Sequence, residues 1–353
     1  MLTQLEVKNI GPFNQQGVSL EFKPLTIIIG PNNVGKSSLI YAYDLMADRQ
    51  KYIHPLSSIP SFIHKPSSSN KGEISTEYLA TNGTKVKKKA IIDLDKRGGT
   101  PEFEININGT PGVQSTGVER TGFEEALAFF MNTTYLLSNR TFIAPVIGIR
   151  QGDSAYTIDP LGSNIIQFLA YKFTDRDPNW PDAEDWLKKV DPFVKMLKVP
   201  LIENKVSLVT ERSPEPTMVD VNLAQQGSGI QRALQIISAL VFTPKNSCII
   251  IEEPEMNLHP KAQEVIVDLI NKAVNDWDKQ VIFTTHSLDM LLPYASDLDI
   301  THDGRSKTEH TIINKDKCTL CVLKYDDGVV VARNDVHYKG YKDFRHDLKD
   351  VWG

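Results

Sequence analysis

Apolar residues form short runs or alternate with polar residues at the two ends of the chain. The run LTIIIG, residues 25–30, is continuously apolar, which is typical of a strand buried on both faces. Two segments before it, LTQLEVKNI and VSLEF, alternate and predict strands with one buried face. The apolar runs at 248–251 and 281–283 predict two further strands. Segments with helical spacing follow these strands, so the pattern predicts an α/β fold.

The middle of the chain has a different pattern, which predicts an inserted region. Residues 53–72 are rich in Pro and Ser and are expected to form an exposed loop. EISTEYLA, VKKKAIIDLD and EFEINI follow as predicted strands, with turns at Asn82-Gly83 and Asn108-Gly109.

The second half of this middle region predicts helices followed by strands. A helix is expected over 122–137, and an amphipathic segment at 181–199 precedes strands near 201–210. The sequence has no sustained heptad repeat, so long coiled-coil arms are not expected. The expected division is the N-terminal part of the α/β domain at 1–45, an inserted β-rich and helical region at 46–138, a middle region with a helical lobe at 139–220, and the C-terminal part of the α/β domain at 221–353.

Composition limits the class of protein. The chain has 353 residues, a net charge of −5, 41% hydrophobic and 24% charged residues, which is typical of a globular protein and unlike a basic nucleic-acid module. KVKKKA at 85–90 is the one dense basic run, and a solvated strand face is favoured over phosphate binding there. No apolar run approaches a membrane span and MLTQLEVKNI does not resemble a signal peptide, so a cytoplasmic location and no membrane partner are expected.

The three cysteines predict neither a disulfide framework nor a metal site. Their number fits a reducing compartment. Cys318 and Cys321 lie three residues apart on the first strand of a predicted hairpin, where their side chains point to opposite faces. This geometry argues against a shared zinc ion.

The stretch GPNNVGKSS, residues 30–38, matches the phosphate-binding pattern G-x-x-x-x-G-K-[ST] between a strand and a helix. Gly30 and Gly35 allow the backbone to turn its N–H groups onto phosphate oxygens at a helix N-terminus. Lys36 is expected to reach the β and γ phosphates, and the Ser37 hydroxyl to bind Mg²⁺. ATP and Mg²⁺ are therefore the expected cofactors, and the predicted ATP-binding residues are Gly30, Asn32, Asn33, Val34, Gly35, Lys36, Ser37 and Ser38.

Acidic and histidine side chains follow the two later apolar strands. Glu252, where Asp is more usual, is the candidate ligand of Mg²⁺, and Glu253 the candidate general base or water-positioning group. His286 follows Thr284 and Thr285, where an imidazole could bond a γ-phosphate or hold the attacking water. A solvated acidic turn and a structural histidine are the alternatives.

The order of these motifs resembles that of ABC-type ATPases. LEVKNIGPF, GPNNVGKSS, GSGIQRAL, IEEPEMNLHP and TTHS are similar to the branch that contains SMC proteins, RecF and the OLD (overcoming lysogenization defect) family, especially OLD-type AAA ATPase domains. The resemblance covers the two ends of the chain. It implies a P-loop NTPase fold of the ABC-ATPase type, a mixed sheet with helices, plus an inserted β-rich and helical subdomain. That branch commonly carries Glu at the position of Glu252.

The resemblance also implies roles that the residues alone do not establish. AQQGSGIQRAL, residues 224–234, corresponds to the signature helix, which contacts the nucleotide of a second subunit; a simple helix cap is the alternative. It departs from the LSGGQ-like form of transporter subunits, which argues against a transporter partner. The implied residues are Gly227, Ser228, Gly229 and Gln231 in the signature, Glu255 and Asn257 in a loop at the dimer interface, and Gln151 as a further Mg²⁺ contact.

The implied function is ATP hydrolysis by a homodimer that forms head-to-tail on ATP binding. The ATP-bound homodimer would drive or gate a DNA-processing or phage-defence effector, with DNA as a further candidate partner. OLD proteins often append a Toprim nuclease domain, but residues 292–353 are short for one, so the effector, a nuclease or toxin, is expected on a separate polypeptide. The alternative is a nucleotide-gated scaffold or sensor with little hydrolysis. A small-molecule kinase is disfavoured by the signature and His286.

Overall fold

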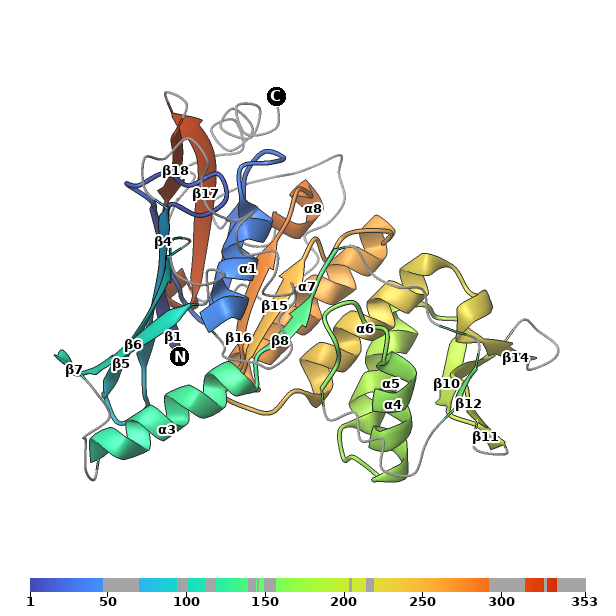
Figure 1. Cartoon of the computed structure of the whole chain (residues 1–353). Coiled ribbons are helices and arrows are strands. Elements are labelled where there is room, and N and C mark those ends of the chain that lie inside the picture. Colours follow the sequence, from blue (N-terminus) through green and yellow to red (C-terminus); the bar gives the residue numbers. More distant parts are fainter. Residues whose placement is uncertain are drawn as a thin grey trace. The chain divides into compact units, whose positions relative to one another are not determined.

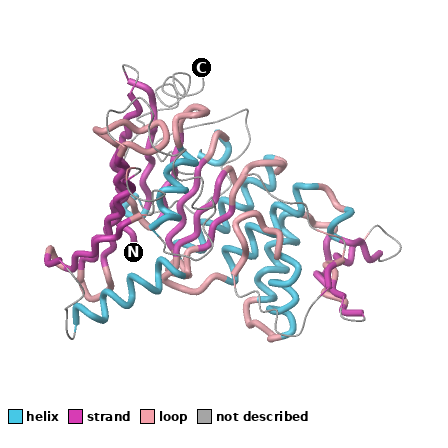
Figure 2. Tube along the Cα trace, viewed as in Figure 1, coloured by secondary structure: helices cyan, strands magenta, loops and turns pink. Residues whose placement is uncertain are grey.

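The computed structural model forms two compact units (Figures 1 and 2). Unit 1 comprises Met1–Thr133, Asn246–Cys248 and Tyr294–Gly353, and unit 2 comprises Thr134–Lys245 and Ile249–Pro293. The residues that the structure describes are 1–46, 70–93, 95, 101–111, 118–138, 144, 146–148, 157–202, 205–213, 219–291, 315–326 and 329–334. Most of the loop predicted at 53–72, from 53 to 69, lies outside them.

An antiparallel sheet forms one part of unit 1. Its strands run in the order β2-β1-β4-β5-β6-β7, so the strands of the predicted insert join the sheet that the N-terminal strands begin. Asn82-Gly83 and Asn108-Gly109 connect β4 to β5 and β6 to β7, which confirms the predicted turns. The bounds are β1 Leu2–Lys8, β2 Val18–Glu21, β4 Lys71–Leu79, β5 Lys85–Asp93, β6 Glu102–Ile107 and β7 Thr110–Pro111.

The basic run lies on β5 and has acidic neighbours on β4. Lys85 pairs with Glu77 at 3.9 Å and Lys89 with Glu73 at 3.0 Å. Lys88 points inward and donates to the Met46 carbonyl at 2.7 Å. The run is therefore a strand with one solvated face, as favoured from the sequence, and part of its charge is already paired.

Helix α3 (Val118–Met131) packs beside this sheet. Tyr78 packs against Phe129 with ring centroids 4.9 Å apart, and its hydroxyl donates to Glu125 at 2.8 Å. The predicted helix over 122–137 is wrong at both ends. It begins four residues earlier and ends at Met131, and Thr134–Leu136 forms strand β8 of unit 2. The β-branched and aromatic residues of β8 adopt the strand because they pair in parallel with β15.

The strand that precedes the phosphate-binding loop, β3 (Leu25–Ile29), lies in a second group of strands in unit 1, together with β17 (Cys318–Asp326) and β18 (Val329–Arg333). β3 is fully buried and pairs in parallel with β17, which pairs in turn with β18 as the predicted hairpin. The helix α1 (Lys36–Met46) follows β3, and a 3₁₀ turn, η5 (Lys315–Lys317), precedes β17. Because β17 and β3 are parallel, the C-terminal end of β17 lies at the edge where the phosphate-binding loop leaves the sheet.

The centre of unit 2 has strands in the order β16-β15-β8, with β15 and β8 parallel. β15 (Cys248–Glu252) and β16 (Gln280–Thr284) form where the apolar runs predicted strands, and all of their positions are buried. α6 (Ser228–Phe242) precedes β15 and α7 (Pro260–Asn275) follows it, while α8 (Leu288–Leu291) follows β16. His259 accepts from the Lys261 N–H and caps α7, with Pro260 in the first turn.

The described residues of unit 2 also form two further helices and two small sheets. Phe242 at the end of α6 packs against Phe168 and Trp180, with centroids 5.8 and 6.2 Å apart. The amphipathic segment at 181–199 divides at Asp191-Pro192, because proline cannot continue the helix. The bounds are α4 Ile165–Thr174, α5 Trp180–Val190, β9 Ile147–Gly148, β10 Val194–Lys198, β11 Leu201–Ile202, β12 Lys205–Val206, β13 Val209–Arg212, β14 Val219–Asn222 and η3 Leu223–Gln225.

Among the helices in the part of the chain that the structure describes, none is long and apolar enough to cross a membrane.

Candidate functional site

The phosphate-binding loop of unit 1 has no space for side chains at its two glycines. A Cβ on Gly30 would lie 2.7 Å from the Leu323 carbonyl oxygen, and one on Gly35 would lie 2.5 Å from Pro12. Gly35 has φ +107° and Asn33 has φ 64°, a conformation that Asn tolerates better than most residues. The loop thus has a strongly turned conformation, and β17 and the segment around Pro12 pack closely against it.

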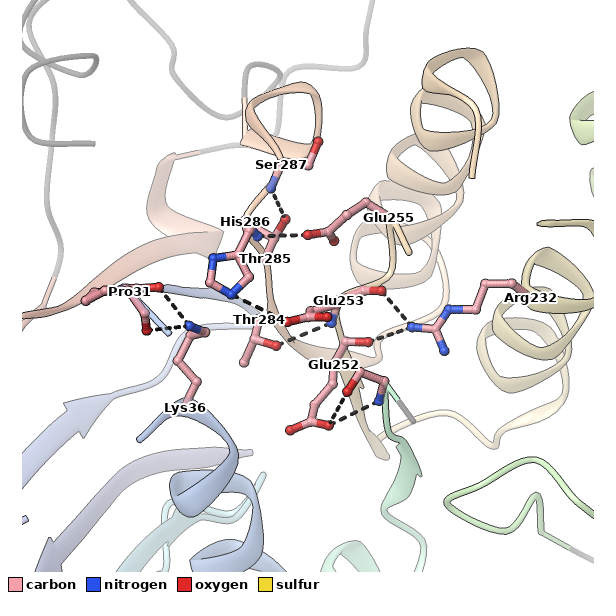
Figure 3. Close-up of polar contacts among 12 residues, drawn as sticks. Pro31, Lys36, Arg232, Glu252, Glu253, Glu255, Thr284, Thr285, His286 and Ser287 are labelled. Atoms are coloured by element: carbon pink, nitrogen blue, oxygen red, sulfur yellow. Dashed lines mark hydrogen bonds and ion pairs between the residues drawn. The ribbon is translucent and has the colours of Figure 1, made fainter. Parts of the chain in front are cut away.

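Lys36 and Ser37 lie where this loop enters α1. The buried Lys36 ammonium donates to the carbonyl oxygens of Gly30 at 2.7 Å and Pro31 at 2.9 Å (Figure 3). Asn32, Asn33 and Ser37 are exposed, and Val34 is fully buried. The ammonium is held by neutral carbonyls, for which phosphate oxygens are stronger partners.

Tyr325 contacts the phosphate-binding loop, and the sequence did not predict this contact. Its hydroxyl, at the end of β17, donates to the Asn33 carbonyl at 3.0 Å, while about half of the residue is exposed. Tyr325 therefore fixes the apex of the loop from a strand almost 300 residues away in the chain. No local pattern could have indicated it, because the parallel pairing of β17 with β3 creates the contact.

In unit 2, Glu252 ends β15 with one carboxylate oxygen held and the other available. Its Oε2 accepts from the Ser138 N–H at 3.1 Å and from the Ser138 hydroxyl at 3.3 Å, just beyond the end of the parallel strand β8. Its Oε1 is buried and has no hydrogen-bond partner among the described residues. A buried carboxylate oxygen needs a cation or a donor, so Glu252 fits a divalent metal ion.

Glu252 would not hold such an ion alone. Within the described residues, no group of three or more His, Cys, Asp or Glu side chains is arranged to bind a metal. Mg²⁺ in nucleotide sites takes one or two protein oxygens, with phosphates and water as the other ligands. The donor chemistry of Glu252 and Ser37 suits that mode, and Gln151 lies outside the described residues.

Glu253 has a backbone conformation that is costly for its residue type. Its φ is 44°, in the left-handed region, and the conformation is held by hydrogen bonds on both sides. The Glu253 N–H donates to the Thr284 carbonyl at 2.9 Å, and the Glu253 carbonyl accepts from Arg232 at 2.7 Å. His286 Nε2 lies 3.4 Å from Glu253 Oε1 (Figure 3). The structure therefore brings together the predicted base and the predicted histidine.

Arg232 was visible in the sequence as a polar residue of the signature helix, but no role was predicted for it. It is buried, and its guanidinium donates to the carbonyl oxygens of Leu137 at 3.2 Å, Glu252 at 2.6 Å and Glu253 at 2.7 Å. Burial lowers the pKa of Arg232 to about 9, while the nearby glutamates act in the opposite direction. One side chain of α6 thus holds the ends of β8 and β15.

The signature residues fall into two groups. Gly227 and Ser228 are exposed at the start of α6, whose N-terminus has no side-chain cap, and this suits an approaching anion. Gly229 instead packs against its own chain, because a Cβ there would lie 2.6 Å from the Asn257 carbonyl oxygen. The buried Gln231 amide donates to the Gln226 carbonyl at 3.0 Å. Contact of these residues with a second subunit stays a prediction.

The loop after β15 contains the two predicted interface residues. Asn257 is exposed with φ 63°. Glu255 is turned toward its own chain, where Oε1 accepts from the His286 N–H at 2.8 Å (Figure 3). Its position at a dimer interface stays a prediction.

Comparison with known proteins gives the family. A family model described as an AAA ATPase domain matches residues 1–110 and 163–291, more than half of the chain. The chain belongs to this family. The AAA ATPase domain has the P-loop ATPase fold, mixed α/β, with sheets and helices arranged as in SMC heads. This confirms the predicted fold class, while placement in the branch of SMC, RecF and OLD proteins stays a prediction.

Curated relatives of this AAA ATPase domain match it over shorter stretches. The energy-coupling factor transporter ATP-binding protein EcfA2 of Mycoplasma capricolum is 25% identical over 124 residues, 35% of this chain and 37% of the relative. The uncharacterized protein MJECL11 of Methanocaldococcus jannaschii is 38% identical over 73 residues, 20% of this chain and 63% of the relative. The chain thus spans less than two thirds of each of these relatives.

Solved structures match over nearly the whole chain. An SMC head bound to the C-terminal winged-helix domain of ScpA superposes with a TM-score of 0.60 and 13% identity, covering 94% of this chain and 97% of that one. An SMC head derived from Pyrococcus furiosus, with an extended coiled coil and bound to the ScpA C-terminal domain, gives 0.56 and 12%, covering 99% of each chain. At these identities the likeness establishes the fold.

Proposed function

We propose that this AAA ATPase domain binds Mg²⁺-ATP through residues 30–38 and hydrolyses it to ADP and phosphate. The observation that supports hydrolysis most directly is the Glu253–His286 pair, 3.4 Å apart, beside the metal-competent carboxylate of Glu252. Glu253 orients the attacking water and accepts its proton, and His286 holds the same water or the γ-phosphate. The fixed backbone of Glu253 preorganises its carboxylate for that step.

The metal ligands in this proposal are the Ser37 hydroxyl and Glu252, with Gln151 as a further contact. A Mg²⁺ ion held there would supply positive charge to stabilise the phosphoryl group as it is transferred. Ser138 contributes by occupying one oxygen of Glu252, which leaves the other for the cation.

Two copies of the chain are proposed to close head-to-tail around two nucleotides. Support comes from the exposed Gly227 and Ser228 at an uncapped helix N-terminus, which can approach the phosphates bound by a second copy. Asn257 lies on the exposed side of the neighbouring loop and is proposed to contact that copy.

The ATP-bound dimer is proposed to drive or gate a separate effector protein in DNA processing or phage defence, in the cytoplasm. Support comes from the sequence resemblance to the OLD branch and from the SMC heads, whose solved structures are bound to ScpA domains. A scaffold that binds ATP and its partner with little hydrolysis is the second candidate, favoured by the intrachain contacts of Gln231 and Glu255.

Hydrolysis is tested by phosphate release from wild type, Glu253→Gln and Glu264→Gln. Glu264 is exposed on α7 and provides the same chemical change outside the site. We expect Glu253→Gln to lose at least about a hundredfold in kcat and to keep ATP binding, because a general base contributes 10²–10⁴-fold. Equal rates for wild type and Glu253→Gln would exclude this mechanism, and tight ATP binding by an inactive wild type would support the scaffold.

A further inference from the structure

Gln263 joins two loops that carry the proposed catalytic residues. It lies in the first turns of α7 and is buried. Its Nε2 donates to the Leu258 carbonyl at 3.0 Å, and its Oε1 accepts from the Ser287 hydroxyl at 2.8 Å. Leu258 ends the loop after β15, and Ser287 directly follows His286. The Gln263 side-chain amide therefore hydrogen-bonds to both loops, with its N–H on the loop after β15 and its oxygen on the loop after β16.

The same two loops are connected at other points. The His286 N–H donates to Glu255 Oε1 at 2.8 Å (Figure 3). The Glu253 N–H donates to the Thr284 carbonyl at 2.9 Å. With the Gln263 contacts, these bonds connect residues 253–258 to residues 284–287 along their length. The two segments are thus held as one hydrogen-bonded body.

This body also contacts the signature helix. Gly229 approaches the Asn257 carbonyl so closely that a Cβ would lie 2.6 Å away, so a displacement of α6 must move the loop or be resisted by it. Leu258 is the next residue along, and its carbonyl is the one that Gln263 holds.

We propose that Gln263 is a positioning residue that transmits displacement of the Asn257 loop to His286 through Ser287. When the loop shifts, the Leu258 carbonyl carries the Gln263 amide with it, and the Ser287 hydroxyl follows. His286 then changes its position against Glu253. This inference rests on the proposed function only for the role of His286 in hydrolysis, because the hydrogen-bonded connection itself requires no nucleotide.

The connection is tested by amide hydrogen exchange on the nucleotide-free full chain. Gln263→Leu removes both contacts, and Ser287→Ala removes one. We expect exchange to rise together in segments 253–259 and 284–287 in both variants. Asn271→Leu replaces a buried amide about two turns further along α7 and should leave both segments unchanged. Exchange that rises in only one segment, or in neither, would overturn the proposal.

The functional consequence is tested by separating kcat from ATP affinity. Two neutral hydrogen bonds are at stake, so Gln263→Leu should lower kcat by about tenfold with the ATP Kd unchanged. The Gln263→Leu/Ser287→Ala double variant should lose no more than Gln263→Leu alone, because the two residues act in series. Additive losses, or a change confined to Kd, would contradict the transmission role.

These two tests distinguish the possible failures. If wild type releases no phosphate, the proposed hydrolysis fails, and the exchange experiment still decides whether Gln263 joins the loops. Should Gln263→Leu fold poorly, Gln263→Glu keeps the acceptor for Ser287 and removes the donor to Leu258. Like Ser287→Ala it breaks the connection at one contact, so exchange should rise in both segments, and protection equal to that of wild type would count against the proposal.

Discussion

Gly227 and Gly229 lie two residues apart in the signature and are constrained by different parts of the molecule. A Cβ on Gly227 meets nothing within 4 Å, whereas one on Gly229 would lie 2.6 Å from a backbone oxygen of the same chain. The small size of residue 229 is therefore explained by packing within its own chain. At residue 227 it is free to serve a partner or ligand.

Substitution of Gly229 should mainly reduce stability, whereas substitution of Gly227 should mainly weaken ATP-dependent dimer formation. Gly229→Ala should reduce the free energy of unfolding by about 1–3 kcal/mol, because the backbone of the Asn257 loop must move. Gly227→Ala should cost less than about 1 kcal/mol, since it only replaces a better helix N-cap, yet it should weaken ATP-dependent dimer formation. Chemical denaturation and solution mass measure the two effects, and equal destabilisation by both variants would contradict this assignment.

Tyr325 predicts an effect on nucleotide binding. Tyr325→Phe removes one hydrogen bond to the Asn33 carbonyl and should weaken ATP binding by about two- to tenfold. Lys324→Met alters the same strand with the side chain on its opposite face and should leave ATP binding unchanged. Titration with a fluorescent ATP analogue measures both affinities, and an unchanged Kd for Tyr325→Phe would show that the contact does not support the loop.

At the scale of elements, α6 is held at its C-terminal end by a buried lysine. Lys279, just before β16, donates to the carbonyl oxygens of Leu240 and Val241. Burial lowers the pKa of Lys279 to about 7 from 10.5. Between these values the unfolded chain binds one more proton than the folded chain, so the free energy of unfolding rises with pH across this window.

This linkage is measurable with one substitution. From about pH 7 to about pH 9, the unfolding free energy of wild type should rise relative to Lys279→Met, by up to about 1.4 kcal/mol per pH unit. Lys272→Met is a suitable control, since Lys279 and Lys272 both lie over the Trp277 ring, at 4.8 and 5.7 Å, and Lys272 is only half-buried. Parallel pH profiles for wild type and Lys279→Met would contradict the buried position of this charge.

Elements with strong periodicity were predictable from the sequence, and elements that depend on distant partners were not. β3, β15 and β16 follow from continuous apolar runs, and the phosphate-binding loop follows from its glycines. The three-residue strand β8 was assigned to a helix, because only its pairing with residues 249–251 makes it a strand.

The same reason explains the site residues that the sequence did not reveal. Arg232, Ser138 and Gln263 act on backbone or carboxylate oxygens of segments remote in the chain, and no spacing rule identifies such partners. The predicted pair Glu253 and His286 could be anticipated because each ends or follows a recognisable buried strand.

At the scale of the whole molecule, the proposed function divides its residues between the two units. The phosphate-binding loop belongs to unit 1, while Glu252, Glu253, His286 and the signature belong to unit 2. Variants of the first set should therefore abolish ATP binding, and variants of Glu253 and His286 should spare binding and abolish turnover. This separation distinguishes an ATP-driven dimer from a scaffold that only binds nucleotide.

The most direct test of the central claim is the solution mass of wild type and Glu253→Gln, each with Mg²⁺-ATP and without nucleotide, with phosphate followed in the same samples. The account predicts that ATP produces a dimer that persists in Glu253→Gln and dissociates in wild type as phosphate appears. A mass that never responds to ATP, or a wild type and variant that behave identically, would contradict the ATP-driven dimer.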